Sequence, residues 1–213
     1  MSANLMSLAR SGGKFLKLYG DRKMVRPLPY LRRVAWLQNL GFQNIDTGIK
    51  SNEIDSFEID VVVPNVSDWS RVLGSYNSTS ILFTPGDHLT PGQISLNSSL
   101  YFDFTFDFKN RHKYRFLKRD GLLIEWLDGE FVNSISADNK TDYNYLGLFS
   151  GKTTAHPRIF GFRCYYNDVI LCDLIPVLDL SGRPAMYDEV RGQFFYNQGT
   201  GEFTWGELDS QTT

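Results

Sequence analysis

The chain has 213 residues, of which 42% are hydrophobic and 15% aromatic, enough for the core of one large all-β domain or two small ones. It has no run of about 18 apolar residues, which excludes a membrane-spanning helix, and residues 1–10 lack the pattern of a secretory signal. The net charge of −2 is divided unevenly. Residues 1–36 contain eight basic residues (Lys and Arg) and one Asp, whereas residues 37–213 contain 14 basic and 23 acidic residues.

Residues 1–33 are predicted to form a basic N-terminal arm. Glycine turn signals at residues 12–13 and 20–21 allow a small hairpin within it, and Pro27-Leu28-Pro29 marks the boundary with the next domain. A basic arm on an acidic body suggests docking on an anionic protein surface. The alternative is a hairpin packed on its own domain. The cations expected to anchor the arm are Arg10, Lys14, Lys17, Arg22, Lys23 and Arg26.

From residue 34 to residue 207, short apolar or alternating segments follow one another with turn residues between them. Residues 100–108 are the clearest case, since four Phe fall on one face of the expected strand and polar residues fall on the other. This spacing predicts an all-β fold, a jelly-roll sandwich of two antiparallel sheets, with residues 208–213 as a tail. The expected strands are 57–63, 71–75, 80–83, 100–108, 111–118, 121–126, 146–149, 158–166, 169–177, 194–196 and 202–205.

Two motifs bracket this region. The first is Trp36-Leu37-Gln38-Asn39-Leu40-Gly41-Phe42-Gln43-Asn44-Ile45-Asp46-Thr47-Gly48-Ile49, and the second runs from Asp173 through Met186-Tyr187-Asp188 to Phe195-Tyr196-Asn197-Gln198-Gly199-Thr200-Gly201-Glu202-Phe203. Both resemble concanavalin A-like (laminin G-like) sandwich domains of virion proteins from phages of gut bacteria and of some gut bacterial surface proteins. The resemblance implies the sandwich fold and a binding surface on the middle loops.

The two cysteines are expected to remain thiols. If Asn167-Asp168 is a two-residue hairpin turn, Cys164 lies opposite Leu171 and Cys172 lies opposite Arg163. The two side chains then point to opposite faces of the sheet and do not form a disulfide.

The strand that contains Glu58 and Asp60 raises the question of glycoside hydrolysis, which other proteins with concanavalin A-like folds perform with two or three carboxylates on one strand face. The position of the second Glu holds Val62 or Val63, which cannot act as an acid or a nucleophile. We therefore expect no enzymatic activity.

Metal and cofactor sites are also not expected. His88, His112 and His156 have no metal-site spacing. Residues 138–142, Asp-Asn-Lys-Thr-Asp, place oxygen atoms at alternate positions and are compatible with a single calcium ion, but they lack the Gly and Glu of an EF-hand loop. A polar hairpin tip is the favoured interpretation.

Carbohydrate binding needs an exposed aromatic platform beside amide or carboxylate groups. The loops offer five candidate residues of this kind, although an aromatic residue in a sandwich more often packs in the core or at its rim. They are Trp69, Tyr76, Asn77, Tyr143 and Tyr145.

The sequence thus predicts a non-enzymatic phage virion protein, made in the host cytoplasm and present in many copies. Its arm attaches to capsid or tail proteins, and its sandwich serves decoration or adhesion to host or mucus glycans. The alternative is a bacterial carbohydrate-binding or adhesion module. A glycoside hydrolase is a third and weaker reading, and nucleic acid is not an expected partner.

Overall fold

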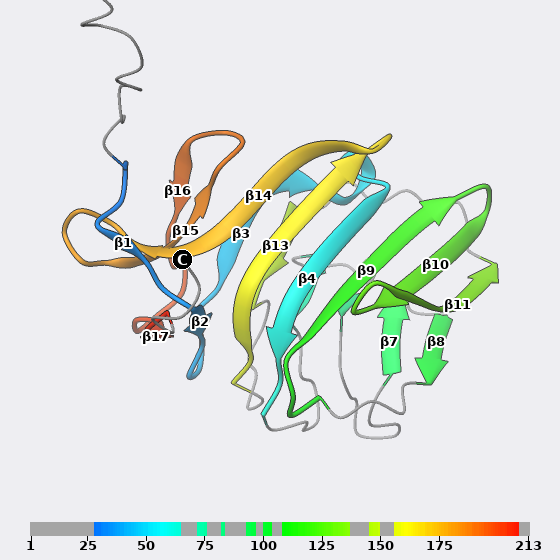
Figure 1. Cartoon of the computed structure of the whole chain (residues 1–213), viewed down its shortest axis with the longest axis horizontal. Coiled ribbons are helices and arrows are strands. Elements are labelled where there is room, and N and C mark those ends of the chain that lie inside the picture. The colour runs from blue at the N-terminus through cyan, green and yellow to red at the C-terminus, as the bar shows by residue number, and fades with distance from the viewer. Residues whose placement is uncertain are drawn as a thin grey trace, which may run out of the picture.

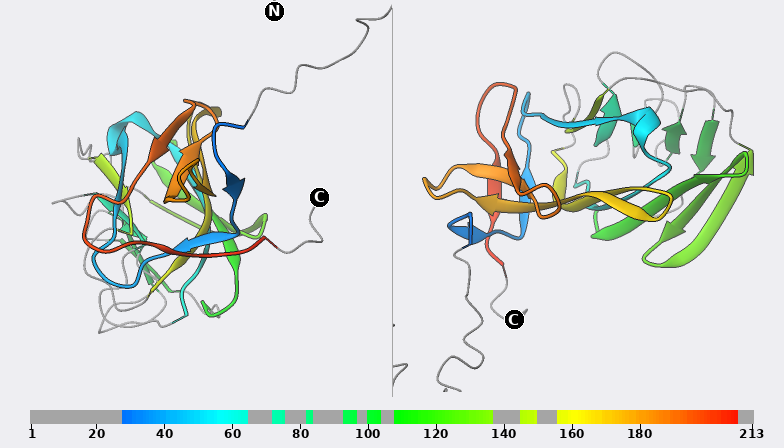
Figure 2. Two further views of the ribbon diagram at one scale, coloured as in Figure 1. Left: turned by 90° about the vertical axis from the view of Figure 1, so that its left-hand side faces the viewer. Right: turned by 90° about the horizontal axis from the view of Figure 1, so that it is seen from above.

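The computed structural model describes residues 28–64, 72–75, 82–83, 93–96, 100–103, 108–136, 145–149 and 156–208. In this part of the chain the strands form two antiparallel sheets, one of eleven strands and one of six. The sheets lie one behind the other in Figure 1, and the view from above in Figure 2 shows them as two layers. The predicted two-sheet β-sandwich is therefore confirmed.

The larger sheet, sheet A, has the strand order β11-β10-β9-β4-β13-β14-β15-β16, with β1 beside β14 and β2 between β13 and β17. Its first strands are β1 (Arg32–Arg33), β2 (Trp36–Gln38), β4 (Ser56–Val62), β9 (His112–Arg119), β10 (Leu122–Leu127) and β11 (Glu130–Ser136). Its later strands are β13 (Arg158–Tyr166), β14 (Val169–Leu178), β15 (Pro184–Asp188), β16 (Gln193–Phe195) and β17 (Thr204–Gly206).

The smaller sheet, sheet B, has the order β3-β12-β5-β6-β7-β8. Its strands are β3 (Ile45–Lys50), β5 (Leu73–Ser75), β6 (Leu82–Phe83), β7 (Gln93–Leu96), β8 (Leu100–Asp103) and β12 (Tyr145–Leu148). A short 3-10 helix, η3 (Ser51–Glu53), connects β3 of this sheet to β4 of sheet A. Of the predicted strand 100–108, the first half is β8, residues 104–107 lie outside the described residues, and Phe108 is buried.

Two-residue turns fix the register of the hairpins in sheet A. Asp128-Gly129 and Asn167-Asp168 both have positive φ angles, the conformation of a type I′ turn, as their sequences predict. The turn between β9 and β10 is Asp120-Gly121, one residue later than the expected Arg119-Asp120, because glycine tolerates the second left-handed position better than aspartate.

The core fills the space between the two sheets. Alternation along β4 shows how the sequence produces it, because Phe57, Ile59 and Val61 are buried while Glu58 and Asp60 face outward. Each fully buried side chain of this size contributes about 2–3 kcal/mol relative to an exposed one. The largest fully buried side chains include Tyr114, Phe116, Phe149, Phe162, Leu146 and Leu148.

The two motifs from either end of the chain meet in space. Strand β2, from the first motif, pairs with β17, which directly follows the second. The amide of Asn44 donates to Oδ1 of Asn197 at 3.0 Å, and the amide of Gln198 donates to the carbonyl oxygen of Asn44 at 2.9 Å. Gln43 Nε2 donates to the carbonyl oxygen of Glu202 at 3.1 Å. Their polar residues therefore hold the ends of the sandwich together.

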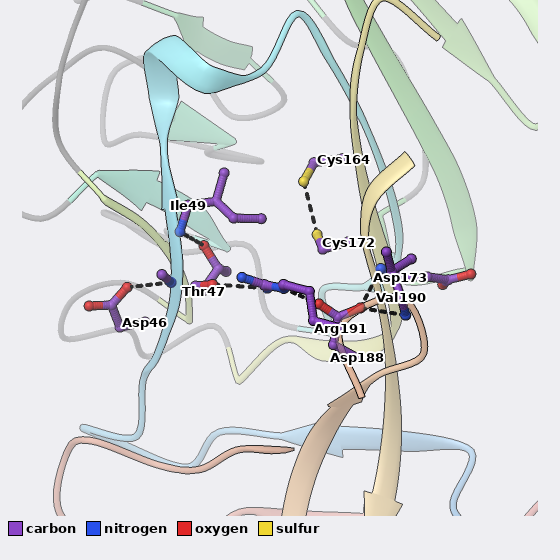
Figure 3. A network of polar contacts seen from close by, with 10 residues as sticks. Asp46, Thr47, Ile49, Cys164, Cys172, Asp173, Asp188, Val190 and Arg191 are labelled. Carbon is purple, nitrogen blue, oxygen red and sulfur yellow. Dashed lines mark hydrogen bonds and ion pairs between the residues drawn. The ribbon is translucent and has the colours of Figure 1, made fainter. Parts of the chain in front are cut away.

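A buried carboxylate joins the two sheets at the same end (Figure 3). Asp188 is fully buried, and its Oδ1 accepts hydrogen bonds from the amides of Asp173 and Val190 at 3.1 and 2.9 Å. Its Oδ2 pairs with Arg191, which also donates through Nη2 to the carbonyl oxygen of Thr47 on β3 at 3.1 Å. One charged pair thus links β15 of sheet A to β3 of sheet B.

The expected placement of the cysteines is wrong. A β-bulge after Cys164 leaves Leu171 as the extra residue, so Cys164 lies directly opposite Cys172. Both side chains are fully buried on the same face, with their sulfur atoms 2.9 Å apart (Figure 3). The turn itself is as predicted, so the difference arises entirely from the bulge.

Residues 1–27 of the expected arm, with all six of its candidate anchoring cations, lie outside the described residues. Residues 30–33 lie against the sandwich. Tyr30 is buried, with its ring 5.3 Å from that of Tyr187, and Arg32 and Arg33 pair with Leu178 and Val177. None of the described helices is long and apolar enough to cross a membrane.

Candidate functional site

Of the five residues predicted to bind carbohydrate, Trp69, Tyr76, Asn77 and Tyr143 lie outside the described residues. Tyr145 is the first residue of β12 in sheet B, and its side chain is exposed. The Lys50 ammonium lies 5.6 Å from the centre of its ring. The structure therefore places one predicted residue at the surface and brings it together with a cation. Residues 138–142, interpreted as a polar hairpin tip that is compatible with one calcium ion, are also outside the described part.

A row of charged and aromatic side chains crosses the outer face of sheet A, the face turned away from sheet B. The row consists of five directly opposed residues on β10, β9, β4, β13 and β14, which share one face because antiparallel partners point the same way. In order they are Trp126, Arg115, Glu58, Arg163 and Asp173. We call this set the outer row.

Charges alternate along the outer row. Arg163 Nε donates to Asp173 Oδ2 at 2.9 Å, and Arg115 Nε lies 3.9 Å from Glu58 Oε1. The Arg115 guanidinium also lies 5.4 Å from the ring centre of Trp126 and 5.7 Å from that of Tyr165. Cation–π contacts of this kind hold a guanidinium in place while its edge stays open to solvent.

Asp60 forms the centre of a second group beside the outer row. Arg111 donates to it through both Nε and Nη2, at 2.8 and 2.6 Å, in the two-pronged geometry that suits guanidinium and carboxylate. The Arg111 guanidinium lies 4.1 Å from the ring centre of Phe160. Lys113 is directly opposite Asp60 on β9 and is exposed.

A hollow opens where β13 and β14 separate. The two strands pair as far as Phe162 and Leu174, after which β13 pairs with β2 and β14 pairs with β1. The open hollow between them has a volume of about 180 Å³. Its charged lining residues are Arg33, Glu58, Asp60, Arg111, Lys113, Arg163 and Asp173.

The carboxylates at the hollow shift the pKa values of three neighbouring groups, Arg111, Arg163 and Tyr165. The hydrogen bond from Arg111 to Asp60 raises the pKa of the Arg111 guanidinium. Burial lowers the pKa of Arg163, but the Asp173 carboxylate outweighs burial, and the pKa is raised overall. Burial and then the nearby Glu58 carboxylate raise the pKa of the Tyr165 phenol. At neutral pH both guanidinium groups are therefore positively charged and the phenol is neutral.

Aromatic side chains border the outer row on the side of β10 and β11. Trp126 lies opposite Phe131 of β11, so the two rings share the outer face. Phe131 is 61% exposed, one of the most exposed large apolar side chains in the described structure. An exposed ring beside hydrogen-bonding charges can stack on the apolar face of a sugar ring.

This chain is similar to known proteins in structure but not in sequence. No family model matches the sequence, and no curated protein matches it. The fold has a solved counterpart. It is a proposed carbohydrate-binding protein from Bacteroides ovatus, similar with a TM-score of 0.54 at 12% identity. The match covers 84% of this chain and 61% of that protein, and at this identity it shows a shared fold alone.

The outer face of sheet A was not among the carbohydrate-binding surfaces predicted from the sequence. Glu58 and Asp60 are noticeable in the sequence as paired carboxylates, but their arginine partners lie about fifty or more residues away in the chain. One local signal was available. Alternation along residues 112–119 puts Lys113 and Arg115 on the same face of their strand.

Proposed function

We propose that this chain is a carbohydrate-binding module that uses the outer face of sheet A. The observation that carries the proposal is the exposed Phe131 ring beside Trp126 at the end of a row of paired charges on a sheet face. The shared fold with a protein proposed to bind carbohydrate supports the same class of ligand. Many copies on one surface would convert weak binding at each site into strong attachment.

We propose binding without catalysis. Val62 follows Glu58 and Asp60 on the outer side of β4, where a hydrolase of the related type places a further carboxylate. Asp60 is held by Arg111, and Glu58 faces Arg115 and Arg163. Both carboxylates thus serve as partners of basic side chains in this proposal.

The proposal is tested by affinity electrophoresis and calorimetry against a panel of soluble polysaccharides. Phe131→Ala is expected to weaken binding about tenfold, since stacking on an aromatic ring contributes on the order of 1 kcal/mol or more. Tyr145→Ala is the matched control, because it removes an exposed ring from sheet B. Equal affinity of Phe131→Ala and the unmodified protein, with loss in Tyr145→Ala, would move the site to sheet B.

Our second proposal concerns the location of the module: we propose that it is part of a phage virion. It is supported by the resemblance of the two motifs to virion domains and by the eight Lys and Arg residues within residues 1–36. The arm would then attach the sandwich to capsid or tail. Immunogold labelling of phage particles with antibody against residues 34–207 tests it, because absence of gold from every particle leaves the bacterial surface as the location.

A further inference from the structure

The hollow between β13 and β14 exposes cations more than anions. The side chains of Glu58, Asp60 and Asp173 are only 18%, 17% and 15% exposed. Those of Arg111 and Arg163 are 56% and 44% exposed. The carboxylates therefore lie beneath the guanidinium groups, orienting them, and the groups that meet solvent are mainly basic.

Two further cations, Arg33 and Lys113, line the hollow. Arg33 and Lys113 are both exposed, and neither forms an ion pair with any residue of the described structure. Since residues 37–213 carry 14 basic against 23 acidic residues, this basic hollow lies within an otherwise acidic body. The exposed cations of the hollow therefore attract an anion to this part of an acidic body.

The size of the hollow limits what it can accept. Pockets that enclose a whole small ligand measure about 300–1,000 Å³. At about 180 Å³, this hollow is smaller and open on one side. It suits one charged group of a longer ligand that continues across the face toward the aromatic rings of Trp126 and Phe131.

From these observations we infer that the ligand of the outer face is an acidic polysaccharide, with one carboxylate or sulfate group held in the hollow by Arg33, Arg111, Lys113 and Arg163. This inference rests on the proposed function. Guanidinium groups fixed by carboxylates and aromatic rings lose little freedom on binding an anion, and the N–H groups not used by Asp60 and Asp173 can donate to the oxygen atoms of either group.

The test compares polygalacturonate, which carries carboxylates, and chondroitin sulfate, which carries both groups, with neutral dextran. Double variant Arg33→Gln/Lys113→Gln removes two cations from the hollow and leaves no buried acid without a partner. Its control is Arg32→Gln/Arg119→Gln, which makes the same charge change outside the hollow, where both arginines are exposed and pair with Glu207 and Asp168.

We expect the hollow variant to bind at least one acidic polysaccharide about tenfold more weakly and the control to change affinity less than twofold. Binding should also weaken between 20 and 300 mM NaCl. Preference for polygalacturonate identifies a uronic acid, and binding of chondroitin sulfate but not of unsulfated chondroitin identifies a sulfate ester. Equal loss in both double variants overturns the inference, as does equally tight binding of double-stranded DNA, since either shows unspecific attraction of polyanions.

Failure of the inference and failure of the proposed function look different. If dextran or another neutral glycan binds, and Phe131→Ala but not Arg33→Gln/Lys113→Gln weakens it, the module binds sugars and the acidic ligand is wrong. If no polysaccharide binds at any salt concentration, both are wrong. Circular dichroism melting curves of all variants confirm that each is folded.

Discussion

Glu125 illustrates how one residue can set the pH dependence of stability. It lies on the inner face of β10, where it is 1% exposed, and its Oε1 has no hydrogen-bond partner in the described structure. Burial raises its pKa from 4.5 to about 8. An acid that is protonated in the folded protein and ionised in the unfolded chain costs stability as the pH rises between these two values.

We therefore expect the free energy of unfolding to fall between pH 4.5 and pH 8 and Glu125→Gln to remove most of that fall. Each pKa unit of difference corresponds to about 1.4 kcal/mol, so the gain at pH 9 should be a few kcal/mol. Urea denaturation at pH 5 and pH 9 measures it. Glu130→Gln, at an exposed site on the neighbouring strand, is the control. If the free energy of unfolding fell equally in Glu125→Gln and Glu130→Gln between pH 5 and pH 9, Glu125 would not be the cause of the pH dependence.

Asp188 is a second residue whose effect should be large. Asp188→Asn keeps an oxygen for the amides of Asp173 and Val190 but leaves Arg191 without its carboxylate. Breaking a buried pair in this way costs about 3–5 kcal/mol, whereas Asp168→Asn, in an exposed pair with Arg119, should cost less than about 1 kcal/mol. Thermal and urea unfolding measure the stability of the two variants. A loss below about 1 kcal/mol in both would show that the Asp188–Arg191 pair does not stabilise the fold.

At the scale of the elements, the sequence predicts strands better than their partners. Short apolar or alternating segments identified β4, β9, β13 and β14, and glycine or Asn-Asp turns identified the hairpins. Nothing local distinguishes a bulge at Leu171 from regular pairing, because Leu171, Cys172 and Leu174 are all apolar. Cross-strand partners such as Glu58 and Arg163 depend on the order of strands in the sheet, which no single segment encodes.

The bulge between β13 and β14 has a testable outcome. With oxidised glutathione, which is reduced to two thiols in the exchange, Cys164 and Cys172 are expected to join and the protein to lose two hydrogen atoms. Intact mass spectrometry measures the loss, with Cys172→Ala as the control. A closed loop this short should add about 2 kcal/mol of stability, less any strain. Alkylation of both thiols after unfolding of the treated protein would refute the expectation.

Contact between the two motifs also depends on a glycine. A Cβ at Gly199 would lie 1.8 Å from the carbonyl oxygen of Phe42, so the backbone must move to accept any side chain. Gly199→Ala should therefore cost about 1–3 kcal/mol. Gly41→Ala is the matched control in the facing motif, next to Phe42, because no atom lies within 4 Å of its Cβ position. Chemical denaturation measures the free energy of unfolding of both variants. Equal values would mean that the backbone near Phe42 moves to accept a side chain at position 199 without loss of stability.

For the whole molecule, the sequence predicted the sandwich but not the residue at which the N-terminal part of the chain begins to pack against it. Removal of residues 1–27 is expected to leave the free energy of unfolding within about 0.5 kcal/mol, a change typical of surface substitutions. Removal of residues 1–33 also deletes Tyr30 and β1, which cover Tyr187 and β14, and should cost about 2 kcal/mol or more. Differential scanning calorimetry compares the two truncations. A large loss of stability on removal of residues 1–27 alone would show that these residues belong to the folding unit.

The proposed binding surface was the least predictable feature at this scale, because it forms only after five strands assemble. Trp126, Glu58 and Asp173 are more than forty residues apart from one another in sequence and lie in one row on the sheet. A search for aromatic platforms in loops cannot find such a surface. The acidic composition also conceals it, since the basic side chains are concentrated by the sheet and not by the sequence.

The neighbouring positions of β1 and β17 have a consequence for how such a module can be carried. Arg32 Nη1 and Glu207 Oε2 are 2.8 Å apart, and the Arg32 guanidinium lies over the Trp205 ring, so the path of the chain into the sandwich runs beside its path out (Figure 2). A folding unit with this geometry can be spliced into a surface loop of an unrelated protein without separating the two sides of that loop. Gene fusion could thus insert it internally as readily as append it to an end.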